Sequence, residues 1–290
     1  MQILVSRNGK NTVREIVEGV DVDVYALYHL RRGKQWKSGF VENVSSVPIA
    51  DIRINWAYSG VSSPSAITYN KPSAIALSSD KPACRVALRE AGVPIPRTMV
   101  KEEVLEDIQL PYVCRTAKHQ AGSGFKMAYT TKDLFDAISE GYYYFSDEYR
   151  KKKEYRVHVA HGKVLIMQEK VPIHDDSRAN IIWNHASGEF VFGIVGWNDM
   201  PVEVCKVALD GVKAVGLDFG AVDVLWSDEE DDRAVVCEIN TSPALADYAT
   251  YRYRRYFKWL LRSQEARPHY DYSEYTRPKS FAFKNFQLEE

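Results

Sequence analysis

Two runs of strand-forming residues, separated only by an acidic turn, most constrain how this chain folds. GAVDVLW ends at residue 226, SDEEDDR follows it, and AVVCEIN begins at residue 234. Apolar and β-branched residues favour strands, and a short polar segment between two strands favours a hairpin. Side chains alternate between the two faces of a strand, so Glu238 and Asn240 share one face. If the two strands pair, Asp223 faces the same two residues.

The oxygen atoms of these three side chains suit a magnesium site. Carboxylate and amide oxygens are hard ligands, and Mg²⁺ usually joins one or two protein carboxylates to the phosphates of a substrate. We therefore predict that Asp223, Glu238 and Asn240 hold one or two Mg²⁺ ions, with Mn²⁺ as an alternative ion. The competing interpretation is a polar strand end whose side chains pair locally.

The rest of the chain predicts hairpins mixed with a few helices. In the first 70 residues, QILVS, VDVYALYH and RINWAYS are strand-like, and NTVREIVEG between the first two is weakly helical. Residues 154–171 predict a hairpin that turns at His161 and Gly162. Helices are predicted at residues 80–92, 131–141, 201–216 and 246–263. The body is therefore expected to be α+β, behind an α/β N-terminal unit.

Composition excludes several classes of protein. The chain has 38 Lys and Arg against 39 Asp and Glu, so no global field indicates a nucleic-acid-binding protein. No run approaches the roughly 18 consecutive apolar residues of a membrane span. The first residues, MQILVSRNGK, lack the apolar segment of a secretory signal. The four cysteines have no CxxC spacing, which favours thiols in a reducing cytoplasm.

A glycine-containing loop between two predicted strands suits phosphate binding. The segment CRTAKHQAGSGFKMAYT places Gly122 and Gly124 between strand-like runs. Glycines allow a loop to close over phosphates and to donate backbone N–H groups, and Arg115 and Lys118 add positive charge nearby. A GSG between strands is most often only a turn, and no Walker sequence follows it.

Two further stretches offer polar side chains beside strands. KKKEYRVHV alternates Glu154, Arg156 and His158 on one strand face. A carboxylate there suits ribose hydroxyls, and an arginine suits a phosphate or a carboxylate. DSRANIIWN places Arg178 and Asn180 next to a predicted strand, where alone they indicate little.

Taken in order, these features resemble the ATP-grasp family of carboxylate–amine ligases over about residues 75–245. DKPACRVALREAGVPIPRTMV is similar to the family's Asp-Lys, helix, Gly and Pro-entered strand, and HQAGSGF is similar to its phosphate lid. The resemblance implies an α+β fold with two subdomains that grip ATP, behind a small α/β pre-ATP-grasp domain. The implied divisions are an N-terminal domain 1–75, a central subdomain 76–145, a C-terminal subdomain 146–263 and a tail 264–290.

The resemblance also implies roles for individual residues. Phosphates would contact Lys81, Arg115 and the lid, the adenine would lie in the hinge, and Glu154 would meet the ribose. The implied nucleotide-binding residues are Lys81, Arg115, His119, Gly122, Ser123, Gly124, Glu148, Tyr149 and Glu154. The residues implied at the acyl phosphate are Arg156, Lys170, Arg178 and Asn180. The metal ligands would be Asp223, Glu238 and Asn240.

Departures from the family pattern narrow the resemblance. Arg115 stands where a lysine is usual and delivers a similar charge in a wider fork. Ala221 stands where D-alanine–D-alanine ligases carry an arginine, which argues against that subfamily. EYRV and SRANIIWN look more like the branch of the ribosomal-protein glutamate ligase and related peptide-bond-forming enzymes.

The implied reaction is amide formation through an acyl phosphate, from ATP, a small-molecule or peptide carboxylate and an amine. No general base is identified, because His158, His161, His174 and His185 are each better explained as structural residues. One alternative is an ATP-grasp kinase that phosphorylates a small molecule and stops there. Another is a binding protein that uses the basic and aromatic helix YATYRYRRYFKWLLR for a nucleic acid or an acidic peptide, although packing explains that helix as well. The same helix could instead recruit a nucleic acid or protein acceptor to the ligase. No membrane partner is expected, and a homodimer is the general expectation for the assembly.

Overall fold

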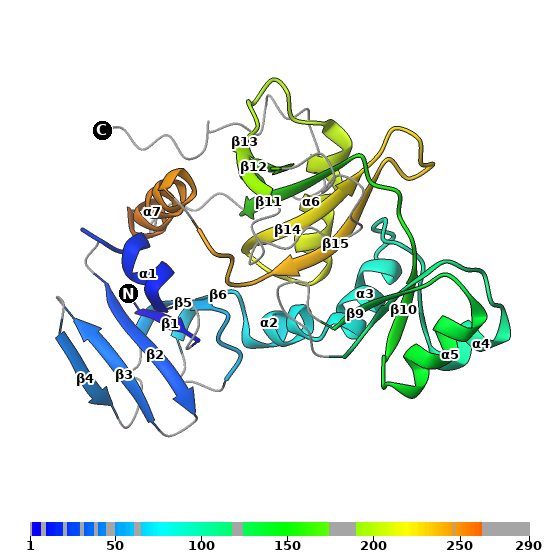
Figure 1. Cartoon of the computed structure of the whole chain (residues 1–290). Helices are drawn as coiled ribbons and strands as arrows, with labels where there is room; N and C mark the ends of the chain where they lie inside the picture. The colour runs from blue at the N-terminus through cyan, green and yellow to red at the C-terminus, as the bar shows by residue number, and fades with distance from the viewer. Residues whose placement is uncertain are drawn as a thin grey trace.

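Three β-sheets succeed one another along the chain in the computed structural model (Figure 1). The structure describes residues 2–6, 10–19, 22–29, 32–37, 40–44, 50–60, 65–117, 124–173, 190–245 and 247–262. A pair of helices joins the first sheet to the second, and a final helix returns to the first sheet (Figure 1). Among these residues, no helix is long and apolar enough to span a bilayer.

The N-terminal sheet has six strands in the order β4-β3-β2-β1-β5-β6. Its parallel part contains the predicted strands β1, β2 and β5 together with β6, and an antiparallel extension adds β3 and β4. The sequence analysis did not predict β3, β4 and β6. The elements are β1 (Gln2–Val5), α1 (Lys10–Ile16), β2 (Asp23–His29), β3 (Arg32–Lys37), β4 (Phe40–Val44), β5 (Ala50–Trp56) and β6 (Ser65–Tyr69).

Helices α2 (Pro72–Ser79) and α3 (Lys81–Glu90) follow the first sheet. The predicted start of α3 is confirmed, because a carboxylate oxygen of Asp80 accepts a hydrogen bond of 3.1 Å from the backbone N–H of Ala83. The helix stops just before Gly92, which has a φ of 69° that favours glycine. This cap fixes Lys81 in the first turn, at the position from which its side chain enters the candidate site.

The central sheet has four antiparallel strands in the order β7-β10-β8-β9. Two helices cover one face, and the core between them includes Val104, Cys114, Leu134 and Phe145. The side chains of alternate residues, such as Arg115, therefore lie on the opposite face. The elements are β7 (Thr98–Val100), α4 (Lys101–Glu106), β8 (Tyr112–Arg115), β9 (Phe125–Ala128), α5 (Thr131–Ser139) and β10 (Tyr144–Asp147).

The third sheet, called sheet C here, has five antiparallel strands in the order β13-β12-β11-β14-β15. Its apolar face packs against α6 through residues such as Val157, Val222 and Val236. The predicted turn is confirmed, since His161 and Gly162 both have positive φ, as two-residue type I′ turns require. The elements are β11 (Lys153–Ala160), β12 (Lys163–Pro172), β13 (Phe190–Ile194), α6 (Val202–Ala214), β14 (Phe219–Trp226) and β15 (Ala234–Asn240).

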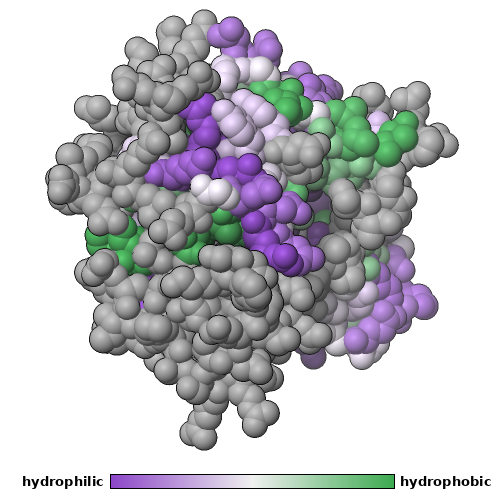
Figure 2. All heavy atoms as spheres, turned by 90° about the vertical axis from the view of Figure 1, so that its left-hand side faces the viewer, coloured by the Kyte–Doolittle hydropathy of each residue, from purple (hydrophilic) through white to green (hydrophobic). Residues whose placement is uncertain are grey.

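The last helix, α7 (Asp247–Arg262), joins the N-terminal sheet to sheet C. Its buried aromatic residues Tyr253 and Phe257 pack against Trp56 of the N-terminal sheet and Phe219 of sheet C. The Trp56 and Tyr253 rings meet edge to face at 5.3 Å. Helices α1 and α7 lie side by side. Figure 2 views the molecule from this side and shows a band of hydrophilic residues across it. This cluster of aromatic residues holds the N-terminal sheet against the end of sheet C.

Candidate functional site

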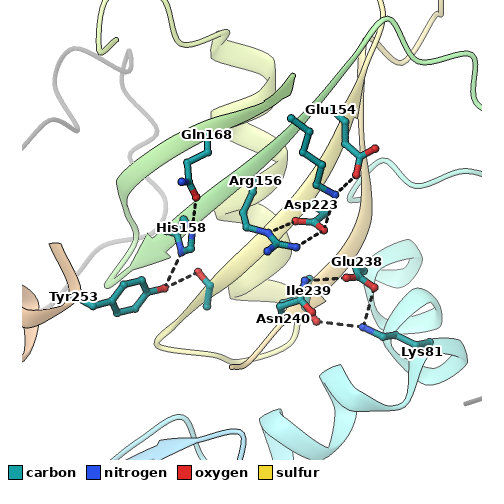
Figure 3. Close-up of polar contacts among 12 residues, drawn as sticks. Lys81, Glu154, Arg156, His158, Gln168, Asp223, Glu238, Ile239, Asn240 and Tyr253 are labelled. Atoms are coloured by element: carbon teal, nitrogen blue, oxygen red, sulfur yellow. Dashed lines mark hydrogen bonds and ion pairs between the residues drawn. The ribbon is translucent and has the colours of Figure 1, made fainter. Parts of the chain in front are cut away.

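The polar face of sheet C gathers predicted site residues from four neighbouring strands (Figure 3). Arg156 on β11 lies opposite Asp223 on β14, and Asp223 lies opposite Glu238 on β15. The acidic turn predicted the β14–β15 hairpin, and strand alternation predicted the shared face of Asp223, Glu238 and Asn240. The other face of the sheet is apolar, and α6 packs against it mainly at β11, β14 and β15.

Asp223 is the centre of the charge cluster on this face. The Arg156 guanidinium donates through Nε to Oδ1 at 2.7 Å and through a terminal nitrogen to Oδ2 at 2.9 Å. The Lys170 ammonium donates to the same Oδ2 at 3.2 Å. Burial alone would raise the pKa of the Asp223 carboxyl, but the Arg156 and Lys170 cations outweigh it and hold that pKa well below its usual range.

A second carboxylate, Glu154, extends the charge cluster toward the start of β11. Its Oε1 accepts from the Lys170 ammonium, and its Oε2 accepts from the Lys151 ammonium at 2.6 Å. Burial would lower the pKa of Lys170, but Asp223 and Glu154 together raise it, so Lys170 stays charged. The sequence analysis missed Lys151. The lysine run just before EYRV, which contains it, is most often only a solvated turn.

The third carboxylate, Glu238, is paired with a cation from a distant helix. The Lys81 ammonium at the start of α3 lies 3.4 Å from Oε2 of Glu238 and 3.5 Å from the carbonyl oxygen of Ile239. The side-chain amide of Asn240 donates to Oε1 of Glu238 at 2.9 Å. Burial alone would raise the pKa of the Glu238 carboxyl. The nearby Lys81 ammonium outweighs burial, so that pKa lies below its usual value.

The predicted residues of the central sheet and the hinge lie outside the charge cluster of sheet C. Arg115 ends β8 with its guanidinium 5.2 Å from the Phe125 ring centre. Burial raises the pKa of the Tyr144 hydroxyl on β10, while the charges of Arg85 and Arg115 lower it. In the hinge, the Tyr149 hydroxyl donates to the carbonyl oxygen of Asp232 at 2.9 Å, beside the half-buried Glu148.

Part of the predicted site lies outside the described residues. Gly124 is described: it has a φ of 62°, and its carbonyl oxygen accepts from the Thr116 N–H at 3.1 Å. The predicted residues outside the described ranges are His119, Gly122, Ser123, Arg178 and Asn180, together with the histidines His174 and His185.

His158 shares the polar face but is fully buried in a closed hydrogen-bond network. Its Nε2 lies 3.0 Å from Oε1 of Gln168, and its Nδ1 lies 3.3 Å from the Tyr253 hydroxyl (Figure 3). Burial lowers the pKa of His158 to about 4. The imidazole is therefore neutral near pH 7 and ties α7 to sheet C, which is the structural role expected for it.

The arginines of α7 are also engaged within the protein. Arg252 is buried and donates to the carbonyl oxygen of Leu165 from Nε at 3.1 Å and from a terminal nitrogen at 2.7 Å. Arg254 pairs with Glu18 at 3.1 Å, and Arg255 lies over the Tyr251 ring. Packing therefore accounts for the basic and aromatic composition of this helix.

The oxygen atoms of the site fit a magnesium ion better than a transition metal. Among the described residues, no three His, Cys, Asp or Glu side chains converge as metal ligands. The available set is two carboxylates and one amide, which suits Mg²⁺ because that ion keeps several waters and completes its shell with substrate phosphates. Both carboxylates are now neutralised by Arg156, Lys170 and Lys81, so an arriving ion would have to exchange with these cations.

Comparison with solved structures identifies the fold. No protein-family model matches the chain, and no curated protein is similar to it in sequence. The D-alanine–D-alanine ligase from Bacillus anthracis aligns at 15% identity and a TM-score of 0.57, over 86% of this chain and 89% of that chain. The ATP-grasp ligase PsnB, complexed with minimal precursor, Mg and ADP, aligns at 17% identity and a TM-score of 0.56, over 87% and 91%.

A third solved structure gives the same result. The macrocyclase MdnC from Microcystis aeruginosa MRC, bound with precursor peptide MdnA, aligns at 14% identity and a TM-score of 0.53, over 84% of this chain and 93% of that chain. These likenesses extend over most of the chain, and the chain has the ATP-grasp fold. The expected α+β fold class and the resemblance drawn from the sequence are therefore confirmed at the level of the fold.

Proposed function

We propose that this chain is an ATP-dependent carboxylate–amine ligase. A substrate carboxylate takes the γ-phosphoryl group of ATP, and an amine then displaces phosphate from the acyl phosphate to form an amide. The observation that carries this proposal is the cluster on sheet C, where Asp223 and Glu238 face each other among four cations (Lys81, Lys151, Arg156 and Lys170).

The charge of the cluster favours a magnesium–nucleotide complex over a bare polyanion. Three carboxylates and four cations leave the described site close to neutral, so a triphosphate arriving without metal would meet no large positive field. Bound Mg²⁺ would supply positive charge at the β- and γ-phosphates, held by Asp223, Glu238 and Asn240. Lys81 at the start of α3 and Arg115 at the end of β8 then contact phosphate oxygens beside the metal.

Other residues of the chain bind and enclose the nucleotide. Glu154 accepts hydrogen bonds from the ribose hydroxyls, and the hinge at Glu148 and Tyr149 contacts the adenine. The lid, with His119, Gly122, Ser123 and Gly124, closes over the phosphates. Closure excludes water, and this matters because an acyl phosphate hydrolyses readily.

Arg156 and Lys170 change partners during this cycle. Without nucleotide they are held by Asp223 and Glu154. With Asp223 at the metal and Glu154 at the ribose, Arg156 and Lys170 would be free to contact the transferring phosphoryl group and to offset its charge. Arg178 and Asn180 complete the binding of the acyl phosphate in this proposal.

The substrates are a small-molecule or peptide carboxylate and an amine. The EYRV strand supports the peptide-bond-forming branch, and two of the structurally similar ligases are complexed with precursor peptides. A peptide or protein acceptor is therefore the first class to test after free amino acids.

The test is ADP release from Mg-ATP with pooled amino acids, small carboxylates and short peptides, with and without hydroxylamine. Hydroxylamine traps an acyl phosphate as a hydroxamate, so pool-dependent ADP with hydroxamate is the expected result. Glu238→Gln should abolish turnover with the fold intact, and Glu229→Gln, in the exposed acidic turn, is the matched control. ADP without hydroxamate would instead indicate a kinase, and full activity in Glu238→Gln would refute the assignment of the site.

A further inference from the structure

Two phenylalanines of the edge strand β13 lie against the two cations that bind Asp223. The Lys170 ammonium is 5.3 Å from the centre of the Phe190 ring, and the Arg156 guanidinium carbon is 5.1 Å from the centre of the Phe192 ring. The two rings touch edge to face at 5.2 Å. The sequence analysis named neither residue as part of the site.

The register of sheet C explains why the rings reach the cations. Phe192 lies directly opposite Lys170, and Phe190 shares its face because it is two residues away. Arg156 stands on β11, beyond β12, and its long side chain crosses toward Phe192. The faces of aromatic rings are electronegative, so rings at these distances attract a guanidinium or an ammonium group.

The attraction matters because the carboxylate partners of these cations are also required elsewhere. In this structure Asp223 and Glu154 hold Arg156 and Lys170 in place. The proposed function, on which this step rests, gives Asp223 to the metal and Glu154 to the ribose. Both cations then lose ionic partners at the moment when they must stay fixed. An aromatic ring is neutral, so neither the metal nor the ribose competes for it.

We propose that Phe190 and Phe192 are positioning residues, whose ring faces keep Lys170 and Arg156 at the γ-phosphoryl group after the nucleotide has taken Asp223 and Glu154. They touch neither ATP nor the acyl substrate in this arrangement and act only through the two cations. A leucine of similar bulk would keep the apolar contact and lose the electrostatic one.

The test compares the binding of Mg-ADP with that of Mg-AMPPNP, which retains a γ-phosphate, by isothermal titration calorimetry. The variants are Phe190→Leu, Phe192→Leu and the double variant, with Phe192→Tyr as the conservative rescue because that ring is only half-buried. Val191→Leu is the matched control, since Val191 lies between the two phenylalanines, points to the opposite face and is 54% exposed. No substrate is needed, and thermal unfolding of each variant checks its fold.

The wild-type chain should bind Mg-AMPPNP more tightly than Mg-ADP. Each leucine variant should lose about twofold to thirtyfold of that preference, the range expected of a cation–π contact, while its Kd for Mg-ADP stays within about twofold. Phe192→Tyr and Val191→Leu should keep the preference. An unchanged preference in both leucine variants overturns the positioning role alone, as does a loss that tyrosine fails to restore. A wild-type chain that binds neither nucleotide overturns the proposed function and this inference together.

Discussion

Asp223 and Glu238 lie directly opposite each other on β14 and β15, yet different cations neutralise them. Asp223 is held by Arg156 and Lys170 from within the same sheet, whereas Glu238 is held by Lys81 from helix α3. The two proposed metal ligands therefore have different structural roles. Asp223 is paired within sheet C, whereas Glu238 connects sheet C to helix α3. This asymmetry leads to the first prediction.

Asp223→Asn should destabilise the fold far more than Glu238→Gln, although both should abolish ligation. Removing Asp223 leaves Arg156 and Lys170 short of a buried partner, which costs about 3–5 kcal/mol of the free energy of unfolding. The side chain of Glu238 is 30% exposed and its ion pair is longer, so Glu238→Gln should lower the free energy of unfolding by only about 1 kcal/mol. Urea unfolding of both variants measures the difference, and equal losses would contradict it.

Lys151 and Lys152 are adjacent in the chain, but only the replacement of Lys151 should lower the free energy of unfolding. The Lys151 side chain is 5% exposed and pairs with Glu154, whereas Lys152 is exposed and pairs with the acidic turn. Lys151→Met should lower the free energy of unfolding by about 2 kcal/mol, because Glu154 then keeps only Lys170. Lys152→Met serves as the control and should leave it unchanged. If Lys151→Met has the same free energy of unfolding as the wild type in urea, the Lys151–Glu154 pair does not contribute to stability.

Stability should decrease as the pH is lowered below about 6.5, partly because of His158. In the unfolded chain a histidine takes up its proton near pH 6.5, whereas burial lowers the pKa of His158 in the folded state to about 4. The unfolded state then binds more protons in this window, so the free energy of unfolding falls by about 2 kcal/mol from pH 7.5 to pH 5 through His158 alone. Above pH 6.5 the contribution is flat.

His158→Gln isolates this effect in urea titrations at several pH values. The variant should lose about 2 kcal/mol of the pH dependence between pH 7.5 and pH 5. A remaining slope is expected from His161, whose pKa is also lowered to about 4 by burial. An identical pH profile in the variant and the wild type would show that His158 titrates in the folded state as it does in the unfolded chain.

Replacing single arginines of α7 tests whether this helix serves packing or the binding of a nucleic acid. Arg252→Ala removes two hydrogen bonds to the Leu165 carbonyl oxygen, so we expect a loss of about 1.5–3 kcal/mol in the free energy of unfolding. Arg255→Ala, next to the exposed Tyr251, should change stability little. Titration with a labelled single-stranded oligonucleotide completes the test. Tight, salt-dependent binding that Arg255→Ala weakens would favour the binding interpretation of this helix.

Local patterns in the sequence were sufficient for part of the fold and part of the site. Helix α3 was predictable because Asp80 caps it and Gly92 ends it, and both signals act within a few residues. The shared face of Glu238 and Asn240 follows from strand alternation alone. The pairing of Asp223 with Glu238 needed one further assumption, a hairpin, which the intervening acidic turn made probable from sequence.

The predictions were incomplete where side chains depend on their surroundings. In α3, the apolar Val86 is 43% exposed, whereas Cys84 lies inside. Strand β6 has too short an apolar pattern to stand out from the loops around it, and it forms because β5 offers a parallel edge. In both cases a neighbouring element, distant in the sequence, decides what a local pattern does.

By itself, the sequence determined the short-range features: the strands and turns of sheet C, the caps of α3 and the face on which each polar residue lies. Only the tertiary structure decided which charges meet. Lys81 reaches the carbonyl oxygen of Ile239, which is 158 residues away, and the neighbouring Glu238. Phe190 and Phe192 meet Lys170 and Arg156 through the strand order and register of sheet C. The physical reason is that alternation and capping act over a few residues, whereas ion pairs and ring contacts depend on which strands become neighbours.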